Sequence, residues 1–266
     1  MKISLPGYAR LTSPRASGIV LESCRSAFES ILAHETLYDF AARQPDARKF
    51  PGRATVYAVE LPDGCGNGVV RRSMRGGALA RLNTDLFLPP TRGFRELLTS
   101  LRLRLAGVAT PEVIGFAVYA AGPVFRRSDV VTREVTGRDL GSVLAAGVND
   151  ERRRVLLDAV ATLVASLAKA GAHHPDLNLR NVLVTGAGAD PAFPAPGYPL
   201  PVTEAVRAYV LDVDRIRFHV PGDPIVLRAN IERLERSLRK RRELEGLAIS
   251  EPDIASLRAR VMELAQ

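Results

Sequence analysis

The spacing of apolar and polar residues predicts two regions of different character, and the first is rich in strands. Between residues 53 and 74, short runs of small and β-branched residues are interrupted at Pro62-Asp63-Gly64, which predicts a β-hairpin. Two more strands are expected at 111–119 and 124–135, and one amphipathic helix from about Arg92 to Leu105. Together these elements predict a small α+β lobe built on an antiparallel sheet.

Beyond about residue 138 the pattern becomes mainly helical. Three helices are expected, at about 152–170, 224–245 and 251–265. A strand resumes at Ala208 to Leu211, after a stretch at 186–203 that holds too much Pro and Gly for a regular element and should form an exposed loop. We therefore divide the chain into an N-terminal extension (1–50), a small lobe (51–137) and a larger helical lobe (138–266). Within the extension, residues 26–42 predict a single packing helix.

Length and composition are those of a folded protein that carries excess positive charge. The chain has 266 residues, 46% of them hydrophobic, and a formal net charge of +8, which favours an anionic partner. Aromatic residues make up only 6% and are not interleaved with the basic runs, which argues against a nucleic-acid stacking surface. The basic run at 233–242 is open to two interpretations, a solvated helix face or a surface that contacts anionic lipid head groups.

Cysteine usage and the hydropathy pattern favour the cytoplasm. Cys24 and Cys65 follow no pairing or metal-binding pattern, so we expect two unpaired thiols in a reducing compartment. The first residues lack the apolar core of a signal peptide, and no stretch is long and apolar enough to span a bilayer.

The residues with the clearest chemistry lie on either side of the Pro-rich loop. Asp176 is followed by Asn181 five residues later, then by a short apolar strand, and a second acid, Asp212, ends the next strand. Carboxylate and amide oxygens suit Mg²⁺, and a carboxylate can accept the proton of an attacking hydroxyl, which are the requirements of phosphoryl transfer. Asp176 and Asn181 alone would also suit a turn held by local backbone hydrogen bonds.

This pattern resembles a known family. The run from His174 to Asn181 is similar to the catalytic loop of the protein-kinase-like superfamily, and the run from Leu211 to Asp214 resembles the strand that carries its magnesium-binding Asp. Within the superfamily the strongest resemblance is to the lipopolysaccharide kinases, which act on 3-deoxy-D-manno-octulosonic acid (Kdo) or core heptose. It covers roughly residues 50–218, and further local similarities lie at 69–77, 91–96, 176–178 and 212–215.

The resemblance implies a two-lobed protein-kinase-like α+β fold, with a small antiparallel-sheet lobe that contains one helix and a larger, mainly helical lobe. It implies that Asp176 accepts the proton of the acceptor hydroxyl and that Asn181 and Asp212 hold Mg²⁺. His174 would then be a scaffold residue of the loop.

On the nucleotide side, the resemblance implies that Glu96 pairs with a basic residue of the preceding strand, either Arg71 or Arg72. Glu96 would otherwise be a solvated helix acid. Residues Glu134 to Gly137 would form the hinge against which adenine rests, and Gly52 would be the glycine nearest the nucleotide phosphates.

The chain departs from common protein kinases in three ways. It has no G-x-G-x-x-G loop and no lysine between Lys49 and Lys169, so an arginine has to contact the phosphates. The position two after Asp176 is Asn178 and not lysine, which favours a small-molecule or glycan acceptor over a protein hydroxyl.

We therefore expect a kinase that uses ATP and Mg²⁺ to phosphorylate a sugar hydroxyl, on Kdo or heptose of the lipopolysaccharide inner core. It would act on a glycolipid at the cytoplasmic face of the inner membrane, bound peripherally to the anionic membrane surface. Two alternatives stay open, namely a kinase of the same superfamily that acts on another small molecule or protein, and a pseudokinase that binds partners without chemistry.

Overall fold

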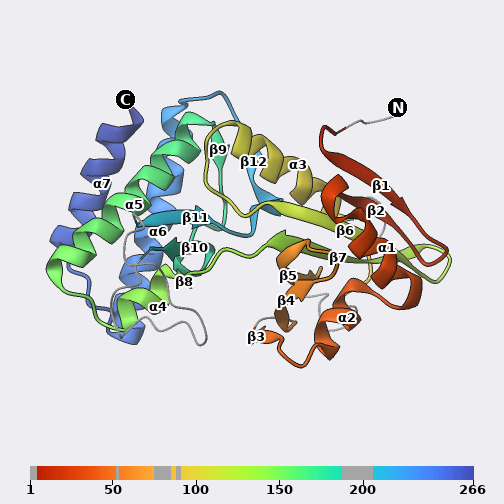
Figure 1. Cartoon of the computed structure of the whole chain (residues 1–266). Helices are drawn as coiled ribbons and strands as arrows, with labels where there is room; N and C mark the ends of the chain where they lie inside the picture. Colours follow the sequence, from red (N-terminus) through yellow and green to blue (C-terminus); the bar gives the residue numbers. More distant parts are fainter. Residues whose placement is uncertain (1–4, 52–53, 75–84, 88–90, 187–205) are drawn as a thin grey trace. The chain divides into compact units, whose positions relative to one another are not determined.

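The computed structural model describes residues 5–51, 54–74, 85–87, 91–186 and 206–266. The chain folds into two compact units, the first formed by residues 1–101 and 112–134 and the second by residues 102–111 and 135–266 (Figure 1). The division passes through α3 (Arg92–Leu105), whose bounds are those predicted from its periodicity. The predicted Gly52, the Arg75-Gly76-Gly77 stretch and nearly all of the Pro-rich loop lie outside the described residues.

The first unit is built on a seven-stranded antiparallel sheet of order β1-β2-β6-β7-β5-β4-β3. Its strands are β1 (Tyr8–Thr12), β2 (Ala16–Leu21), β3 (Arg48–Phe50), β4 (Val56–Leu61), β5 (Gly66–Arg72), β6 (Val113–Ala121) and β7 (Phe125–Arg133). The predicted hairpin is β4 and β5, and the two further predicted strands are β6 and β7. The first fifty residues, which we predicted as an extension, supply three strands of this same sheet.

The single helix predicted at 26–42 is wrong, because this stretch forms two helices, α1 (Arg25–His34) and α2 (Leu37–Arg43). Glu35 is extended, and the Thr36 hydroxyl accepts a hydrogen bond from the Asp39 N–H at 3.1 Å. This cap satisfies one of the N–H groups left open at the start of a helix. Thr36 therefore starts a second helix within a stretch whose apolar spacing predicts one continuous helix.

The helices of the first unit pack on opposite faces of the sheet. Side chains alternate between the two faces of a strand, so the neighbours Val130 and Val131 of β7 belong to different hydrophobic clusters. Val131 packs with residues of α1 and α2, including the fully buried Phe28, and Val130 packs with Leu97 of α3.

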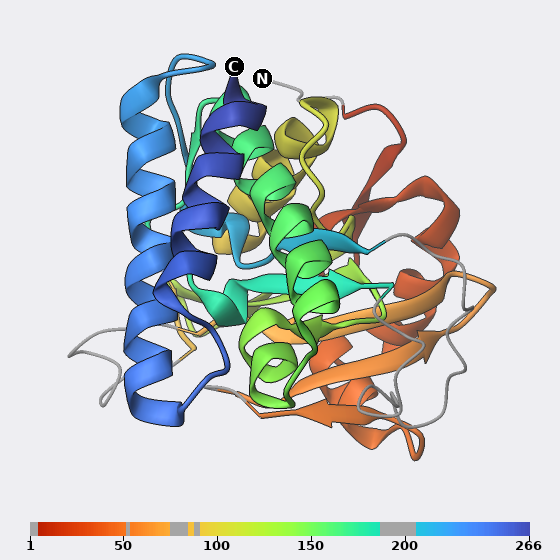
Figure 2. The ribbon, with the colours of Figure 1, turned by 90° about the vertical axis from the view of Figure 1, so that its left-hand side faces the viewer.

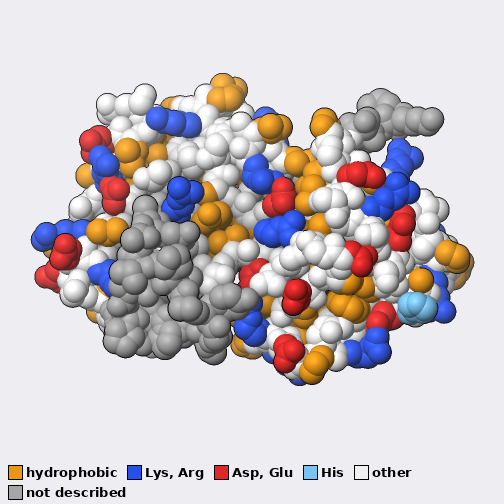
Figure 3. All heavy atoms as spheres, viewed as in Figure 1, with side chains coloured by type: hydrophobic (Ala, Val, Ile, Leu, Met, Phe, Trp, Pro, Cys, Tyr) orange, Lys and Arg blue, Asp and Glu red, His pale blue; other side chains and the backbone are white. Residues whose placement is uncertain are grey.

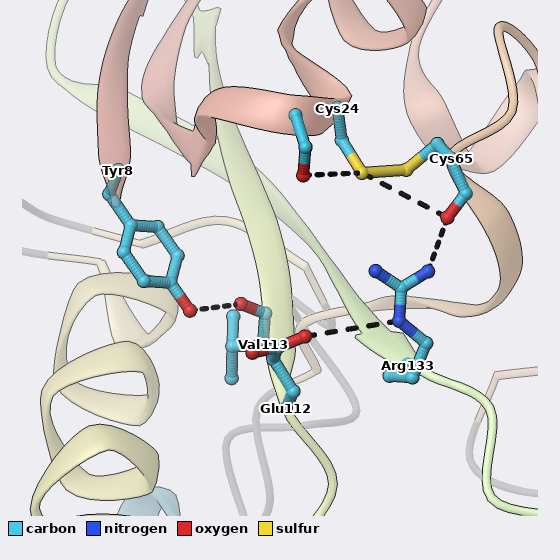
Figure 4. Close-up of a disulfide and its surroundings, with 7 residues drawn as sticks. Tyr8, Cys24, Cys65, Glu112, Val113 and Arg133 are labelled. Atoms are coloured by element: carbon cyan, nitrogen blue, oxygen red, sulfur yellow. Dashed lines mark hydrogen bonds and ion pairs between the residues drawn. A yellow bond between two sulfur atoms is a disulfide. The ribbon is translucent and has the colours of Figure 1, made fainter. Parts of the chain in front are cut away.

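A disulfide joins Cys24 to Cys65, which corrects the prediction of two unpaired thiols (Figure 4). Cys24 ends a short 3-10 turn, η1 (Glu22–Cys24), and Cys65 directly precedes β5; both are buried. Their Cα atoms lie 5.1 Å apart although 41 positions separate them in sequence. The proximity comes from the packing of the first helices against the β4–β5 hairpin, which no spacing rule predicts. The argument for a reducing compartment from unpaired thiols therefore no longer applies.

The second unit consists of helices around two small sheets, of order β11-β10-β8 and β12-β9. Its elements are β8 (Arg138–Asp139), α4 (Leu140–Ala145), α5 (Asp150–Lys169), β9 (Ala172–His173), η3 (Leu179–Asn181), β10 (Val182–Thr185), β11 (Arg207–Val210), η4 (Val213–Arg215), β12 (Arg217–Phe218), α6 (Pro224–Glu245) and α7 (Glu251–Ala265). The three predicted helices are confirmed, and α5, α6 and α7 lie side by side over a common core (Figure 2). In the part of the chain that the structure describes, no helix combines the length and apolarity needed to cross a membrane.

Candidate functional site

The loop that carries Asp176 begins at a sharp turn after α5. Gly171 has a φ of +65°, and a Cβ atom at this position would lie 2.5 Å from the carbonyl oxygen of His219. Only glycine fits both the left-handed conformation and this close approach. The turn directs the chain from the end of α5 into β9, which pairs with β12 and leads to His174.

His174 is fully buried and holds the loop to the strand that precedes Asp212. Its Nδ1 lies 3.2 Å from the Asp176 N–H, and its Nε2 lies 3.0 Å from the carbonyl oxygen of Leu211. A neutral ring can accept at Nδ1 and donate at Nε2 at the same time, and burial lowers the pKa of this imidazole, which favours the neutral form. His174 therefore links the two stretches that carry the candidate functional acids, in keeping with a scaffold role.

Helix α6 supports the loop from the other side. The buried Asn230 accepts from the His174 N–H at 3.0 Å and donates to the Ala172 carbonyl at 2.9 Å. Two turns further along the helix, the Ser237 hydroxyl accepts from the Leu179 N–H at 3.3 Å. The backbone of the loop is thus anchored at both ends by the same helix.

Asn181 and Asp212 lie at the same end of the β10–β11 pair. The register pairs Val182 with Val210, and beyond that pair the Leu211 N–H donates to the Asn181 carbonyl at 2.9 Å. The Asn181 amide nitrogen donates to the backbone oxygen of Asp176 at 2.8 Å, which directs its amide oxygen elsewhere. Asp212 has the left-handed backbone angles φ 55° and ψ 50°, which Asp tolerates better than most residues.

These donors fit the magnesium ion that the resemblance implies. An amide oxygen and a carboxylate are hard oxygen ligands, and Mg²⁺ is commonly held by one or two protein oxygens together with nucleotide phosphates. The hydrogen bond from the Asn181 amide nitrogen leaves the ligating oxygen of that side chain oriented and available.

The Asp176 carboxylate has a charged partner that sequence reasoning missed. Arg233 of α6 donates from a terminal guanidinium nitrogen to Oδ1 of Asp176 at 2.8 Å. Burial raises the pKa of this carboxyl, but the Arg233 hydrogen bond and charge outweigh it, and the pKa lies below its ordinary value. The sequence presents Arg233 only as part of the basic run at 233–242. The polar residues Asn230, Arg233 and Ser237, spaced three and four apart on a helix, are the signal that could have found it.

Most of the basic run at 233–242 is engaged in ion pairs within the protein. Arg239 and Arg242 both pair with Glu251 of α7, at 3.2 and 2.6 Å, and Arg236 lies 3.9 Å from Glu232. Basic and acidic side chains are likewise interspersed on the face that Figure 3 shows. The run is therefore partly neutralised, which weakens its interpretation as a surface for anionic lipid.

In the first unit, Arg71 of β5 forms the predicted ion pair with Glu96 of α3. The Glu96 side chain is only 4% exposed, so the alternative of a solvated helix acid is wrong. Successive strand residues point to opposite faces of a sheet, and Arg71 lies opposite Val130, on the face covered by α3.

Arg72, the other candidate partner of Glu96, points to the opposite face. There it lies 3.4 Å from the fully buried carboxylate of Asp129, which also accepts from the Tyr38 N–H at 3.1 Å. Burial raises the pKa of Asp129 to about 6, in spite of the charge of Arg72. The hydroxyl of Tyr119 accepts from the Leu37 N–H at 2.9 Å, so Asp129 and Tyr119 together complete the cap of α2. Arg72 is accordingly part of a structural cluster.

Glu134, predicted to begin the hinge, follows β7, and its N–H donates to the Asn67 carbonyl at 3.1 Å. Its side chain is nearly buried and forms an ion pair with Arg48 of β3. Arg71, Glu96 and Glu134 thus belong to the first unit, and the three candidates of the loop region belong to the second.

Comparisons with known proteins identify relatives of this chain and a structure of similar fold. A 3-deoxy-D-manno-octulosonic acid kinase of Xanthomonas euvesicatoria pv. vesicatoria (strain 85-10) is 29% identical over 259 residues, 94% of this chain and 92% of the relative. The enzyme of the same name from Stenotrophomonas maltophilia (strain K279a) is 27% identical over 212 residues, 78% of this chain and 75% of the relative. A solved structure described as WaaP in complex with acyl carrier protein has a similar fold, with a TM-score of 0.50 and 16% identity over 94% of this chain and 99% of that one.

The family comparison covers most of the chain. The model of the lipopolysaccharide kinase (Kdo/WaaP) family matches residues 40–259, which include the candidate residues of the first unit and those of the second. The predicted kinase-like α+β fold is therefore confirmed, and the chain belongs to the lipopolysaccharide kinase (Kdo/WaaP) family.

Proposed function

We propose that this kinase transfers the γ-phosphoryl group of ATP to a hydroxyl of a Kdo or heptose residue in the lipopolysaccharide inner core. The observation that carries the proposal is the position of Asp176, Asn181 and Asp212 around one loop. A hydrogen bond joins His174 of this loop to Leu211, directly after β11. The names of the relatives, which are Kdo kinases, support the choice of acceptor.

In the proposed reaction Asp176 orients the acceptor hydroxyl and accepts its proton. The hydroxyl oxygen forms a bond to the γ-phosphorus, and the bond from that phosphorus to the oxygen bridging to the β-phosphate breaks, so that ADP leaves. Asn181 and Asp212 would hold Mg²⁺, which neutralises phosphate charge when bound. The fixed loop backbone would position Asp176 and Asn181 before substrate arrives, and the contacts of Leu211 with His174 and Asn181 would position the neighbouring Asp212.

On the nucleotide side, we propose that Arg71 contacts the phosphates and that Glu96 positions it. A guanidinium can hold phosphate oxygens through two donors, which suits a chain that has no strand lysine. The backbone from Glu134 to Gly137 would contact adenine, with the Glu134 side chain fixed by Arg48. Gly52 would lie near the phosphates, on the evidence of the sequence alone.

We propose that the enzyme works at the cytoplasmic face of the inner membrane, bound peripherally to the anionic surface. The net charge of +8 and the lipid-linked acceptor class support this location. Flotation with vesicles that contain anionic lipid should carry the protein upward, and neutral vesicles should not. Failure to float with either would contradict the proposal.

The acceptor is tested by incubating the purified chain with labelled ATP, Mg²⁺ and either Kdo-containing lipid A or soluble sugars and proteins. Label on the glycolipid supports the proposal, and label only on a soluble acceptor would establish the alternative kinase. If Mg·ATP neither stabilises the protein against heat nor is consumed, the chain is a pseudokinase.

A further inference from the structure

The three polar residues that α6 presents to the loop make two kinds of contact. Asn230 and Ser237 bind backbone groups and so fix the path of the loop. Arg233, placed between them, binds the side chain of Asp176. Because the backbone anchors already determine the loop, the Arg233 contact is not required for its shape.

The Arg233–Asp176 pair is open to solvent and able to exchange partners. The two side chains are 42% and 36% exposed, in contrast to the nearly buried Glu96 of the first unit. An exposed ion pair contributes little net stability, so a ligand anion can compete for the guanidinium. Among the described contacts, one N–H of Arg233 donates a hydrogen bond to Asp176. A guanidinium can also hold a carboxylate or a phosphate through two parallel hydrogen bonds.

We propose that Arg233 determines acceptor specificity by binding an anionic group, a carboxylate or a phosphate, on the sugar that presents the reacting hydroxyl. This inference rests on the proposed function, because it takes Asp176 as the group that receives that hydroxyl. The acceptor anion takes over the guanidinium, and the Asp176 oxygen is released to accept the hydroxyl hydrogen. The reacting hydroxyl and the anion then contact two side chains that lie 2.8 Å from each other, so one sugar residue can present both groups.

The arrangement makes the acceptor's own charge part of the recognition. An acidic sugar supplies a partner for Arg233 and a hydroxyl for Asp176. A neutral sugar can place its hydroxyl on the second carboxylate oxygen of Asp176, but it has no charged group to bind the Arg233 guanidinium. Arg233 is therefore expected to favour acidic acceptors over neutral sugars of the same shape.

The test compares two acceptors and three variants of the full chain. The acceptors are Kdo-containing lipid A and the same glycolipid with its sugar carboxylates converted to methyl amides. The variants are Arg233→Gln, Arg233→Lys and, as a matched control on the same helix, Arg236→Gln, which removes an exposed arginine that pairs with Glu232. Initial rates give KM and kcat for each combination, and thermal unfolding verifies that each variant is folded.

Arg233→Gln should raise KM for the acidic acceptor about ten- to hundred-fold, the usual effect of losing a hydrogen bond between charged groups, and should leave KM for the amidated acceptor nearly unchanged. Arg233→Lys should recover part of the loss, and Arg236→Gln should behave as the wild type.

Two results would overturn the inference. A fall in kcat that is equal for both acceptors, with KM unchanged, would mean that Arg233 only positions Asp176. Equal wild-type KM for the charged and the amidated acceptor, which includes the case that a lipid A phosphate is recognised instead, would show that Arg233 recognises no anion on the reacting sugar. Absence of transfer by the wild type to any glycolipid would instead refute the proposed function, and this inference with it.

Discussion

The loop around Asp176 and the Arg71–Glu96 pair are held in place by different kinds of contact. In the loop, His174 and Asn230 bind backbone groups, and the Asp176 carboxylate stays partly exposed. Glu96 is a nearly buried carboxylate that pairs with an arginine 25 residues away in sequence. Changes to functional side chains of the loop should therefore affect activity alone, whereas changes to the pair should affect stability as well. Four predictions test this difference and the stability of the first unit, from the largest expected effect to the smallest.

Asp176→Asn should lower kcat by about two to four orders of magnitude, because the proposed proton acceptor is lost. The thermal midpoint should hardly change, since the backbone anchors remain and the exposed pair with Arg233 contributes at most about 1 kcal/mol. Phosphate transfer and thermal unfolding measure the two effects. The matched control is Asp158→Asn, which breaks another exposed pair, with Arg260, and should leave activity intact. A marked loss of stability in Asp176→Asn would contradict the expected difference between the loop and the Arg71–Glu96 pair.

Arg71→Gln should reduce the free energy of unfolding by roughly 3–5 kcal/mol, because it leaves the nearly buried Glu96 carboxylate without this charged partner. The double variant Arg71→Gln/Glu96→Gln should recover much of that loss, which denaturant unfolding can measure.

The same variants test the role of Arg71 in nucleotide binding. The double variant should stay folded yet show a higher KM for ATP. Arg72→Gln, which disturbs the cluster on the other face of the sheet, should lose stability without this change in KM. Equal effects of Arg71 and Arg72 on KM would contradict our assignment.

Reduction of the Cys24–Cys65 disulfide should destabilise the first unit by about 4 kcal/mol, the loop-closure value for 41 residues. Hydrogen exchange with and without reductant should show faster exchange in the first unit than in α5 to α7. A Cys24→Ala/Cys65→Ala variant should be insensitive to reductant. Equal acceleration in both units would mean that they unfold together.

Asp129 should make the stability of the first unit depend on pH. Burial raises its pKa from the ordinary 3.8 to about 6, so the folded state favours the protonated form. The corresponding stabilisation, about 3 kcal/mol, is fully present below pH 3.8 and is lost as pH rises through about 6. Asp129→Asn should flatten the stability profile between these values, and the exposed Asp39→Asn should not. An unchanged profile in Asp129→Asn would assign the dependence to another group.

Elements with a strong internal period were predictable from the sequence. The bounds of α3, α6 and α7 and the β4–β5 hairpin follow from apolar spacing and from turn residues, since both act within one element. The break between α1 and α2 was missed because Thr36 acts as a cap through its side chain, which the apolar period does not register.

The sequence by itself determined the family, the catalytic-loop motif from His174 to Asn181 and the acid at Asp212, because these depend on short local spacings. It also restricted the partner of Glu96 to two neighbouring arginines. The tertiary structure decided between them, because which face of β5 lies under α3 depends on packing. It likewise brought Cys24 to Cys65 and Arg233 to Asp176, across 41 and 57 positions. Such contacts arise from the packing of separate elements, and no period within one element encodes them.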